Sequence, residues 1–198
     1  MGYAERDPAA DVEGLDACRK ICILSDLAFG REVLPDEVST EGISGIHLKD
    51  VDIAAAAGYR IKLLGRAIRL PEGRQTAYVA PHLVREDCPL AGVDGVFNAV
   101  MLRGNAVGDV LFYGRGAGDL PTASAVLSDV MDAIAHRSKR RNLDWSQSAQ
   151  MVSASELPMS WYLRGAFSAG DARAVCGPVT LLGDGAVITP PMTAAKAR

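Results

Sequence analysis

Asp16 and Lys20 are the residues whose types and spacing point most directly to chemistry. They stand four residues apart in the segment GLDACRK, so on a helix they share one face and their charged ends can meet. Exposed pairs of this kind are common and contribute only about 0.3 to 0.5 kcal/mol to stability. A lysine held beside a buried helix face can instead act as a proton donor. The spacing therefore leaves two alternatives open, a surface ion pair and a catalytic lysine with its carboxylate.

Further carboxylates precede this pair at the start of the chain. Glu5, Asp7 and Asp11 lie in the turn-rich segment GYAERDPAADVEG. Taken alone, such a segment is typical of a solvated acidic loop. Gathered next to one lysine, the same carboxylates can also surround a cationic group, such as the ammonium group of an amino acid.

The segment FYGRGAGDLPTASAV, residues 112–126, is the second unusual stretch. Gly114, Gly116 and Gly118 alternate between an expected strand and an expected helix. Glycines at such a place let the backbone approach a ligand, and the helix start directs amide groups toward it. The spacing GxGxG is neither the dinucleotide fingerprint GxGxxG nor a phosphate-binding GK[ST] loop. A binding loop and a tight structural turn therefore both remain open.

Metal-binding and nucleophilic patterns are missing from the sequence. The cysteines form no CxxC pair, and the histidines form no HxxxH or zinc-type spacing with them. Cys18 and Cys22 would share a helix face and could grip a metal, but free cysteines more often serve as small buried apolar residues. We assign no metal site and no catalytic histidine.

The composition indicates a soluble globular protein. The 198 residues are 48% hydrophobic, 6% aromatic and 23% charged, with a net charge of -3, and this length suits one domain or one domain with a small appendage. No apolar run approaches the roughly 18 residues of a membrane span, and no basic run would track nucleic-acid phosphates. Because the start lacks the basic and apolar regions of a secretory signal, we predict a cytoplasmic protein that binds neither nucleic acid nor membranes.

The segment 14–29, which carries Asp16 and Lys20, is predicted to be a helix. Its apolar residues recur at helical spacing and form an unusually broad apolar face. We therefore expect this helix to be largely buried. Acidic residues near its start suit the helix dipole, and Gly30 is expected to end it.

Alternating patterns in the middle of the chain predict two hairpins. The ranges 59–68 and 76–84 form strands joined across PEGRQ, and Pro81 is expected to end the second strand or to bulge it. The ranges 98–104 and 106–114 form the second hairpin.

Two further helices complete the main part of the chain. One is predicted over 51–57, with Asp50 as its cap, and the other over 122–137, entered through Pro121. Helices before and after a group of strands indicate an α+β fold, with a mixed, largely antiparallel sheet and helices on one face.

The chain is expected to divide into three parts. Residues 1–145 form the main domain, the serine-rich range 146–160 forms a linker, and residues 161–198 form a small α/β tail of a strand, a short helix and another strand. The tail is too small to fold without packing on the rest of the chain or on another copy.

Three segments together resemble the homoserine dehydrogenase family, and the likeness covers about residues 2–137. They are GYAERDPAADVEGLDACRKICILSDLAFG, EGISGIHLKDVDIAAAAGYRIKLLGRAI and FNAVMLRGNAVGDVLFYGRGAGDLPTASAVLSDV. The first and the third are specific to that family. The resemblance implies reduction of aspartate 4-semialdehyde to homoserine with NADP or NAD, in threonine and methionine biosynthesis, by a homodimer.

The resemblance also implies roles for the residues at the start of the chain. Lys20 would give a proton to the carbonyl oxygen of the substrate, and Asp16 would orient that lysine. Glu5 matches a substrate-binding glutamate and Asp11 a neighbouring acid, which together would grip the ammonium group of the substrate.

In the glycine segment, the resemblance implies that Gly116, with Gly114 and Gly118, faces the cofactor. The N-terminal Rossmann domain of the family, which carries GxGxxG, a second lysine and the metal-binding carbonyls, does not precede Met1. We therefore expect residues 1–145 to be the substrate-binding and dimerisation region, inactive without a nucleotide-binding half.

The tail resembles a truncated ACT module, the amino-acid-sensing domain of many family members. The usual DxPGVL turn of that module is replaced by AGDARAV, so we expect a structural or dimer-supporting remnant rather than a threonine sensor. The alternative for the whole chain is a non-catalytic oligomerisation or amino-acid-binding module that keeps the fold.

Overall fold

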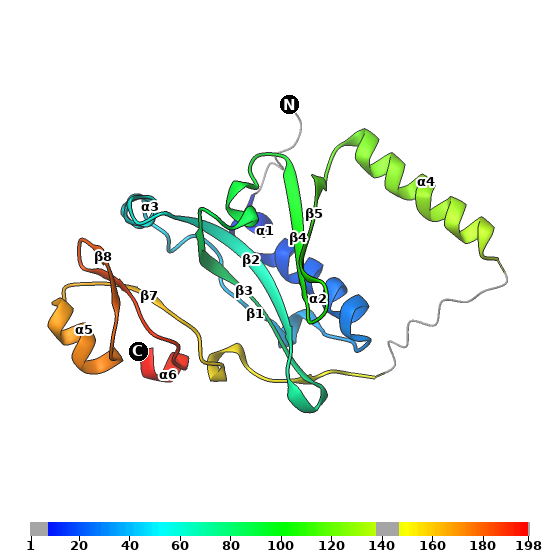
Figure 1. Ribbon diagram of the computed structural model, residues 1–198. Coiled ribbons are helices and arrows are strands. Elements are labelled where there is room, and N and C mark those ends of the chain that lie inside the picture. Colours follow the sequence, from blue (N-terminus) through cyan, green and yellow to red (C-terminus); the bar gives the residue numbers. More distant parts are fainter. Residues whose placement is uncertain (1–7, 138–146, 198) are drawn as a thin grey trace. The chain divides into compact units, whose positions relative to one another are not determined.

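The computed structural model describes residues 8–137 and 147–197 and has a mixed α+β architecture (Figure 1). The chain forms two compact units, each described here by itself: a larger unit of residues 9–85 and 144–198, and a smaller unit of residues 1–8 and 86–143. The α+β class and the largely antiparallel pairing are confirmed. The described strands form three sheets rather than one, in part because short strands occupy the outer edge of the main hairpin.

A long hairpin of β2 (Tyr59–Arg69) and β3 (Arg74–Arg85) forms the centre of the larger unit. It confirms the first predicted hairpin. Along its other edge, β3 pairs in parallel with β1 (Ser39–Thr40) and with β6 (Gln150–Met151). The strand β6 lies within the range expected to be a linker, so part of that range is joined to the sheet.

Pro81 neither ends nor bulges β3, contrary to expectation. The antiparallel register with β2 runs through Pro81 without a shift, and Pro81 lies opposite Leu63. On its other side, β3 pairs with β1 only at Tyr78 and Val79. A residue without an N–H is therefore accommodated where one side of the strand has no described partner.

The predicted helix is confirmed as α2 (Leu15–Phe29), which follows the short helix α1 (Ala9–Val12). Gly30 ends α2 in the left-handed conformation, with φ of 72°, and its N–H donates to the carbonyl of Asp26 at 2.8 Å. The helix packs on β2 and β3 at Gly65. A side chain at Gly65 would begin 3.0 Å from Cβ of Ile21.

One face of α2 contributes to the main core, but the helix is not largely buried. The buried members of this core are Cys18, Cys22, Val33, Val38, Ala77 and Val79. By contrast, Leu15, Ile23 and Leu27 of α2 are each about half exposed. A single hairpin can cover only one stripe of a helix, so the broad apolar face extends beyond the surface that the sheet buries.

The third helix, α3 (Leu48–Ala56), begins three residues earlier than predicted. Asp50 is not its cap but lies in the first turn, where its Oδ2 accepts the backbone N–H of His47 at 3.0 Å. His47 takes the cap position instead, and Asp50 acts at the third helical position as in a capping box. The remaining hydrogen bonds of this carboxylate reach the C-terminal tail.

The tail contains β7 (Tyr162–Arg164), α5 (Ala169–Cys176), β8 (Thr180–Gly183), β9 (Ala186–Ile188) and α6 (Ala194–Ala197). Its three strands form an antiparallel sheet in the order β7-β9-β8. The tail has its own small core, made by Ala172, Cys176, Val179, Val187 and Met192. The predicted strand, helix and strand are present, together with the unpredicted β8.

The smaller unit contains the second predicted hairpin and the last predicted helix of the main part. The hairpin is β4 (Phe97–Gly104) with β5 (Gly108–Arg115), and the helix is α4 (Asp119–Ala135). Pro121 is the third residue of α4 rather than the first. Among the described helices, none combines the length and the apolar character that crossing a bilayer requires.

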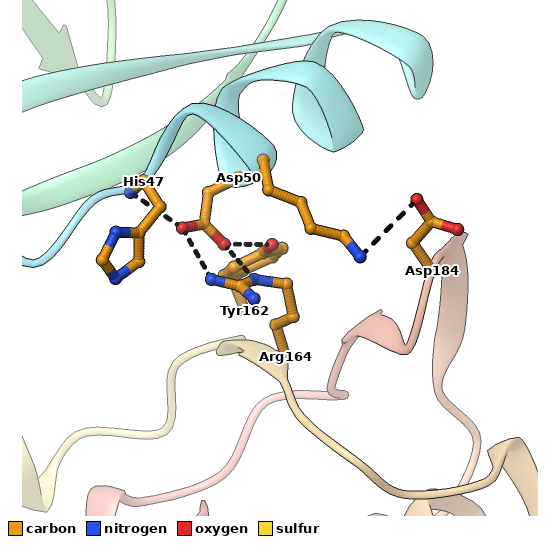
Figure 2. Close-up of polar contacts among 6 residues, drawn as sticks. His47, Asp50, Tyr162, Arg164 and Asp184 are labelled. Atoms are coloured by element: carbon orange, nitrogen blue, oxygen red, sulfur yellow. Dashed lines mark hydrogen bonds and ion pairs between the residues drawn. The ribbon is translucent and has the colours of Figure 1, made fainter.

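Asp50 joins the tail to α3 through a cluster of polar groups (Figure 2). Asp50 itself is buried, with 4% of the residue exposed. Nε of Arg164 donates to Oδ1 at 2.6 Å, Nη2 of Arg164 donates to Oδ2 at 3.2 Å, and the Tyr162 hydroxyl donates to Oδ1 at 2.7 Å. Both donors come from β7, so one carboxylate holds two parts of the chain that are more than a hundred residues apart.

The charges in this cluster support one another. The hydrogen bonds from Arg164, with that from Tyr162, hold the pKa of the Asp50 carboxyl well below its usual range. Burial and the neighbouring Asp50 carboxylate raise the pKa of Tyr162 to about 12. Asp50 is therefore ionised and Tyr162 is neutral across the ordinary pH range, so the carboxylate can accept the hydrogen bonds of Arg164 and of the Tyr162 hydroxyl.

We expect Asp50→Asn to lower the melting temperature of the chain by roughly 5 °C near pH 7, because the substitution leaves Arg164 without its charged acceptor. Since folding lowers the pKa of Asp50, its contribution is present above the unfolded pKa of about 4 and is lost as the pH falls below it. The difference in melting temperature between the parent chain and Asp50→Asn should therefore be smaller near pH 3 than near pH 7. Thermal denaturation followed by circular dichroism measures this difference. Asp52→Asn, at an exposed position on α3, is the control. An equal difference in melting temperature at both pH values would contradict a stabilising role of the ionised Asp50 carboxylate.

Candidate functional site

The helix α2 presents Asp16 and Lys20 on its flank, outside the core. Ala17 and Ile21 face Gly65 of β2, while Cys18 is buried in the core. Successive helical residues are rotated by about 100° around the helix axis. Asp16 and Lys20, which directly precede Ala17 and Ile21, therefore lie to the side of this contact. The Nζ of Lys20 and Oδ2 of Asp16 are 2.7 Å apart, so the predicted pairing is present.

This pair is accessible to other molecules. The side chain of Lys20 is 60% exposed and that of Asp16 is 44% exposed. The pair thus has the geometry of the surface ion pair foreseen from the spacing, on a helix that is firmly packed beneath it. An exposed ammonium group on a fixed support can meet the oxygen atom of a small ligand.

The two predicted substrate-binding acids differ in what the structure describes. Asp11 lies on α1, exposed, three residues before the joint with α2 at Gly14. Glu5 falls outside the described residues. The structure therefore places one of the two acids near the start of α2 along the chain.

The glycine segment lies in the smaller unit and is described by itself. Gly114 is within β5, and no atom lies within 4 Å of the place where its side chain would begin. Gly118 precedes α4, with φ of 114°. Gly116 lies against Asn98, because a Cβ atom at Gly116 would be 2.5 Å from Cγ of that side chain. The glycine at 116 thus makes room for an amide side chain.

Residues that the sequence did not single out lie beside or within this segment. The rings of Phe97 and Tyr113 stack with centroids 4.8 Å apart, and Arg115 lies 5.2 Å from the centre of the Phe97 ring. Asn98 is opposite Gly114 in the hairpin register. Counting residues outward from the predicted turn at Asn105 would have placed Asn98 opposite Phe112, two residues from its actual partner, because the turn includes residues 105–107. The ring stacking depends on side-chain packing, which the sequence pattern does not give.

Other features of the larger unit do not involve the charged pair. A hollow of about 450 Å³ lies between α2 and the turn Pro35–Glu37, lined among others by Cys18, Arg19 and Asp36. Burial, with the neighbouring Cys18, raises the pKa of the Cys22 thiol to about 12. Within residues 8–137 and 147–197, no three His, Cys, Asp or Glu side chains gather where a metal ion could bind.

Comparison with known proteins identifies relatives over most of the chain. The model of the homoserine dehydrogenase family matches residues 1–131. A homoserine dehydrogenase of Pseudomonas aeruginosa is 50% identical over 134 residues, which are 68% of this chain and 31% of that relative. The crystal structure of a homoserine dehydrogenase from Thiobacillus denitrificans has a TM-score of 0.84 at 35% identity, over 99% of this chain and 50% of the other.

A more distant structural neighbour contains a cofactor. It is a hyperthermophilic archaeal homoserine dehydrogenase in complex with NADPH, with a TM-score of 0.53 at 29% identity over 68% of this chain and 37% of that chain. The present chain thus spans about a third of the Pseudomonas relative and half of the Thiobacillus chain. The likeness to the Thiobacillus structure includes the tail, which lies beyond the family match.

We expect Lys20→Ala and Asp16→Asn to change the free energy of unfolding by about 0.5 kcal/mol or less, because an exposed helical ion pair contributes little to stability. Chemical denaturation of the two variants and the parent chain measures this change. A loss above about 2 kcal/mol in either variant would mean that the pair is part of the folding core rather than an accessible site.

Proposed function

The chain belongs to the homoserine dehydrogenase family, and on that premise we propose that it is the substrate-binding and catalytic part of a homoserine dehydrogenase. The substrate would be aspartate 4-semialdehyde, reduced to homoserine in threonine and methionine biosynthesis. The observation that carries this proposal is the 2.7 Å pair of Lys20 and Asp16, which lies within the family match over residues 1–131.

Lys20 would supply the proton in this reaction. When an aldehyde is reduced, negative charge develops on its oxygen, and a nearby ammonium group stabilises that charge and transfers a proton to it. The exposure of Lys20 supports this role, because the ammonium group can approach a ligand without a rearrangement of α2.

Asp16 would orient Lys20 for this transfer. Its carboxylate lies one helical turn before the lysine and limits the directions that the long, flexible side chain can take. Glu5 and Asp11 would bind the ammonium group of the substrate, so that its aldehyde end lies toward Lys20. A carboxylate is the natural partner for such a group.

NADP or NAD would be the cofactor, and a bound nicotinamide ring would supply the hydride. Within this chain the glycine segment is the part suited to its nicotinamide end. Gly114 leaves the backbone open to close approach, and Gly116 admits the amide of Asn98, a group that can hydrogen-bond a carboxamide. Gly118 would contribute backbone at the start of α4. The NADPH-bound archaeal neighbour supports this class of cofactor.

Three parts of the chain would have different roles. Residues 1–145 would form the substrate-binding and dimerisation region, residues 146–160 a linker, and residues 161–198 a tail derived from an ACT module and now structural. We place this function in the cytoplasm. A homodimer would give the exposed apolar side chains of α4, such as Leu127, Met131 and Ile134, the kind of cover that subunit interfaces provide.

A non-catalytic role is the second candidate. The exposed pair on α2 is also what an ordinary surface ion pair looks like, and an oligomerisation or amino-acid-binding module could keep this fold without chemistry. The two candidates differ in one measurable respect, which is turnover in the presence of a nucleotide-binding half.

We expect the 198-residue chain alone to show no turnover, and a fusion to the nucleotide-binding domain of a family member to oxidise a reduced nicotinamide cofactor with aspartate 4-semialdehyde. In this fusion, Lys20→Ala should lower kcat by about 10²- to 10⁴-fold, because the proton donor is lost. The measurement is the decrease in cofactor absorbance with time.

Arg19→Ala is the matched control, since it removes a neighbouring exposed cation from the same helix, and it should leave kcat unchanged. Circular dichroism confirms that each variant is folded. Full activity of the Lys20→Ala fusion would exclude the proposed role of this lysine, and a folded fusion that binds cofactor but never turns over would favour the non-catalytic candidate.

A further inference from the structure

We propose that the segment 41–45 is a positioning element, which holds α1 at a set angle to α2 and so sets the place of Asp11 relative to Lys20. This segment is called the α1 clamp below. The inference rests on the proposed function for its catalytic consequence, whereas the clamp itself follows from contacts within the larger unit.

Gly42 brings the clamp into direct contact with the end of α1. A Cβ atom at Gly42 would lie 2.6 Å from Cα of Glu13 and closer still to the carbonyl oxygen of Val12. Both of these are backbone atoms, which cannot rotate away as a flexible side chain could. Only glycine therefore allows the two backbones to lie at this separation.

Hydrogen bonds hold the clamp on both sides. The N–H of Ile43 donates to the carbonyl of Val12 at 2.8 Å, and the N–H of Glu41 donates to the carbonyl of Val79 in β3 at 2.8 Å. The hydroxyl of Ser44 also donates to the carboxylate of Glu13. The clamp thus connects α1 to the central sheet.

The joint between α1 and α2 is pressed against the same sheet. Gly14 is buried in the left-handed conformation, with φ of 77°, and accepts the N–H of Cys18 at 2.9 Å. A Cβ atom there would be 3.0 Å from Cγ1 of Val79 and 3.3 Å from Cγ2 of Thr40. The turn between the helices therefore has little freedom.

These contacts matter because α1 cannot hold its own position. It has four residues and none of them is buried, so it is too short to be a stable helix by itself. Asp11 immediately precedes Val12, whose carbonyl the clamp holds, and Asp16 follows Gly14 by two residues. The direction from the substrate-binding acid to the catalytic pair is thus set by the clamp, a segment more than twenty residues away along the chain.

Two alanine substitutions in the clamp separate this role from a general loss of stability. Gly42→Ala adds a methyl group against the backbone of α1, while Gly45→Ala adds the same group where no atom lies within 4 Å. Neither glycine is in the left-handed conformation, so the two changes are matched in backbone strain.

In the 198-residue chain, we expect Gly42→Ala to speed amide hydrogen exchange over residues 9–18 by about tenfold and Gly45→Ala to leave it unchanged. In the active fusion, Gly42→Ala should raise KM for aspartate 4-semialdehyde by about tenfold, with a smaller change in kcat, because the substrate-binding acid moves while Lys20 stays on α2. A purely structural role would lower the amount of active enzyme and leave KM unchanged.

If Gly42→Ala fails to fold, Ser44→Ala tests the same element without adding atoms, and we expect it to raise KM about threefold. Unchanged exchange over residues 9–18 in Gly42→Ala would overturn the clamp. Faster exchange with an unchanged KM in an active fusion would overturn its role in positioning. An inactive parent fusion would count against the proposed function alone, since hydrogen exchange in the isolated chain still tests the clamp.

Discussion

The contact between α2 and β2 at Gly65 is the constraint on which the rest of the larger unit depends. At this point the helix lies so close that a Cβ atom on the strand would be 3.0 Å from Cβ of Ile21 and 3.3 Å from the carbonyl oxygen of Ala17. The contact fixes the rotation of α2 about its own axis as well as its distance from the sheet. Because rotation decides which side chains face outward, it also decides that Asp16 and Lys20 lie on the accessible flank.

Two aspartates of the larger unit illustrate how burial decides whether a carboxylate remains accessible. Asp50 is buried, accepts hydrogen bonds from His47, Tyr162 and Arg164, and connects the tail to α3. The hydrogen-bonding capacity of this carboxylate is therefore used within the chain. Asp16 is half exposed and pairs with a lysine that is itself open to solvent, which leaves the pair available to a ligand. The difference arises from where each residue lies on its helix, not from the residue type.

Local patterns in the sequence were sufficient for the longer helices, the two main hairpins and the charged pair, but not for short elements such as β1, β6 and β8. Apolar periodicity predicted α2 and both hairpins, and the four-residue spacing predicted the contact of Asp16 with Lys20. Features that depend on distant segments were missed or wrongly predicted. Pro81 continues β3 because one side of the strand has no described partner at that residue. Asp50 accepts a hydrogen bond from a strand more than a hundred residues away along the chain. No local pattern in the sequence indicated the importance of Gly42, because its contact with the Val12 carbonyl depends on the folded arrangement of the two segments.

Chemical rescue of the Lys20→Ala fusion tests most directly the proposed role of the Lys20 ammonium group as proton donor. Small alkylammonium ions at about 0.1 M can occupy the space left by the lysine and provide the missing proton, so we expect them to restore turnover at least tenfold, with a rate that depends on the acidity of the amine. The same ions should have no effect on the parent fusion or on Arg19→Ala. Undiminished activity of a folded, cofactor-binding Lys20→Ala fusion without any added amine would contradict the assignment of Lys20 as proton donor.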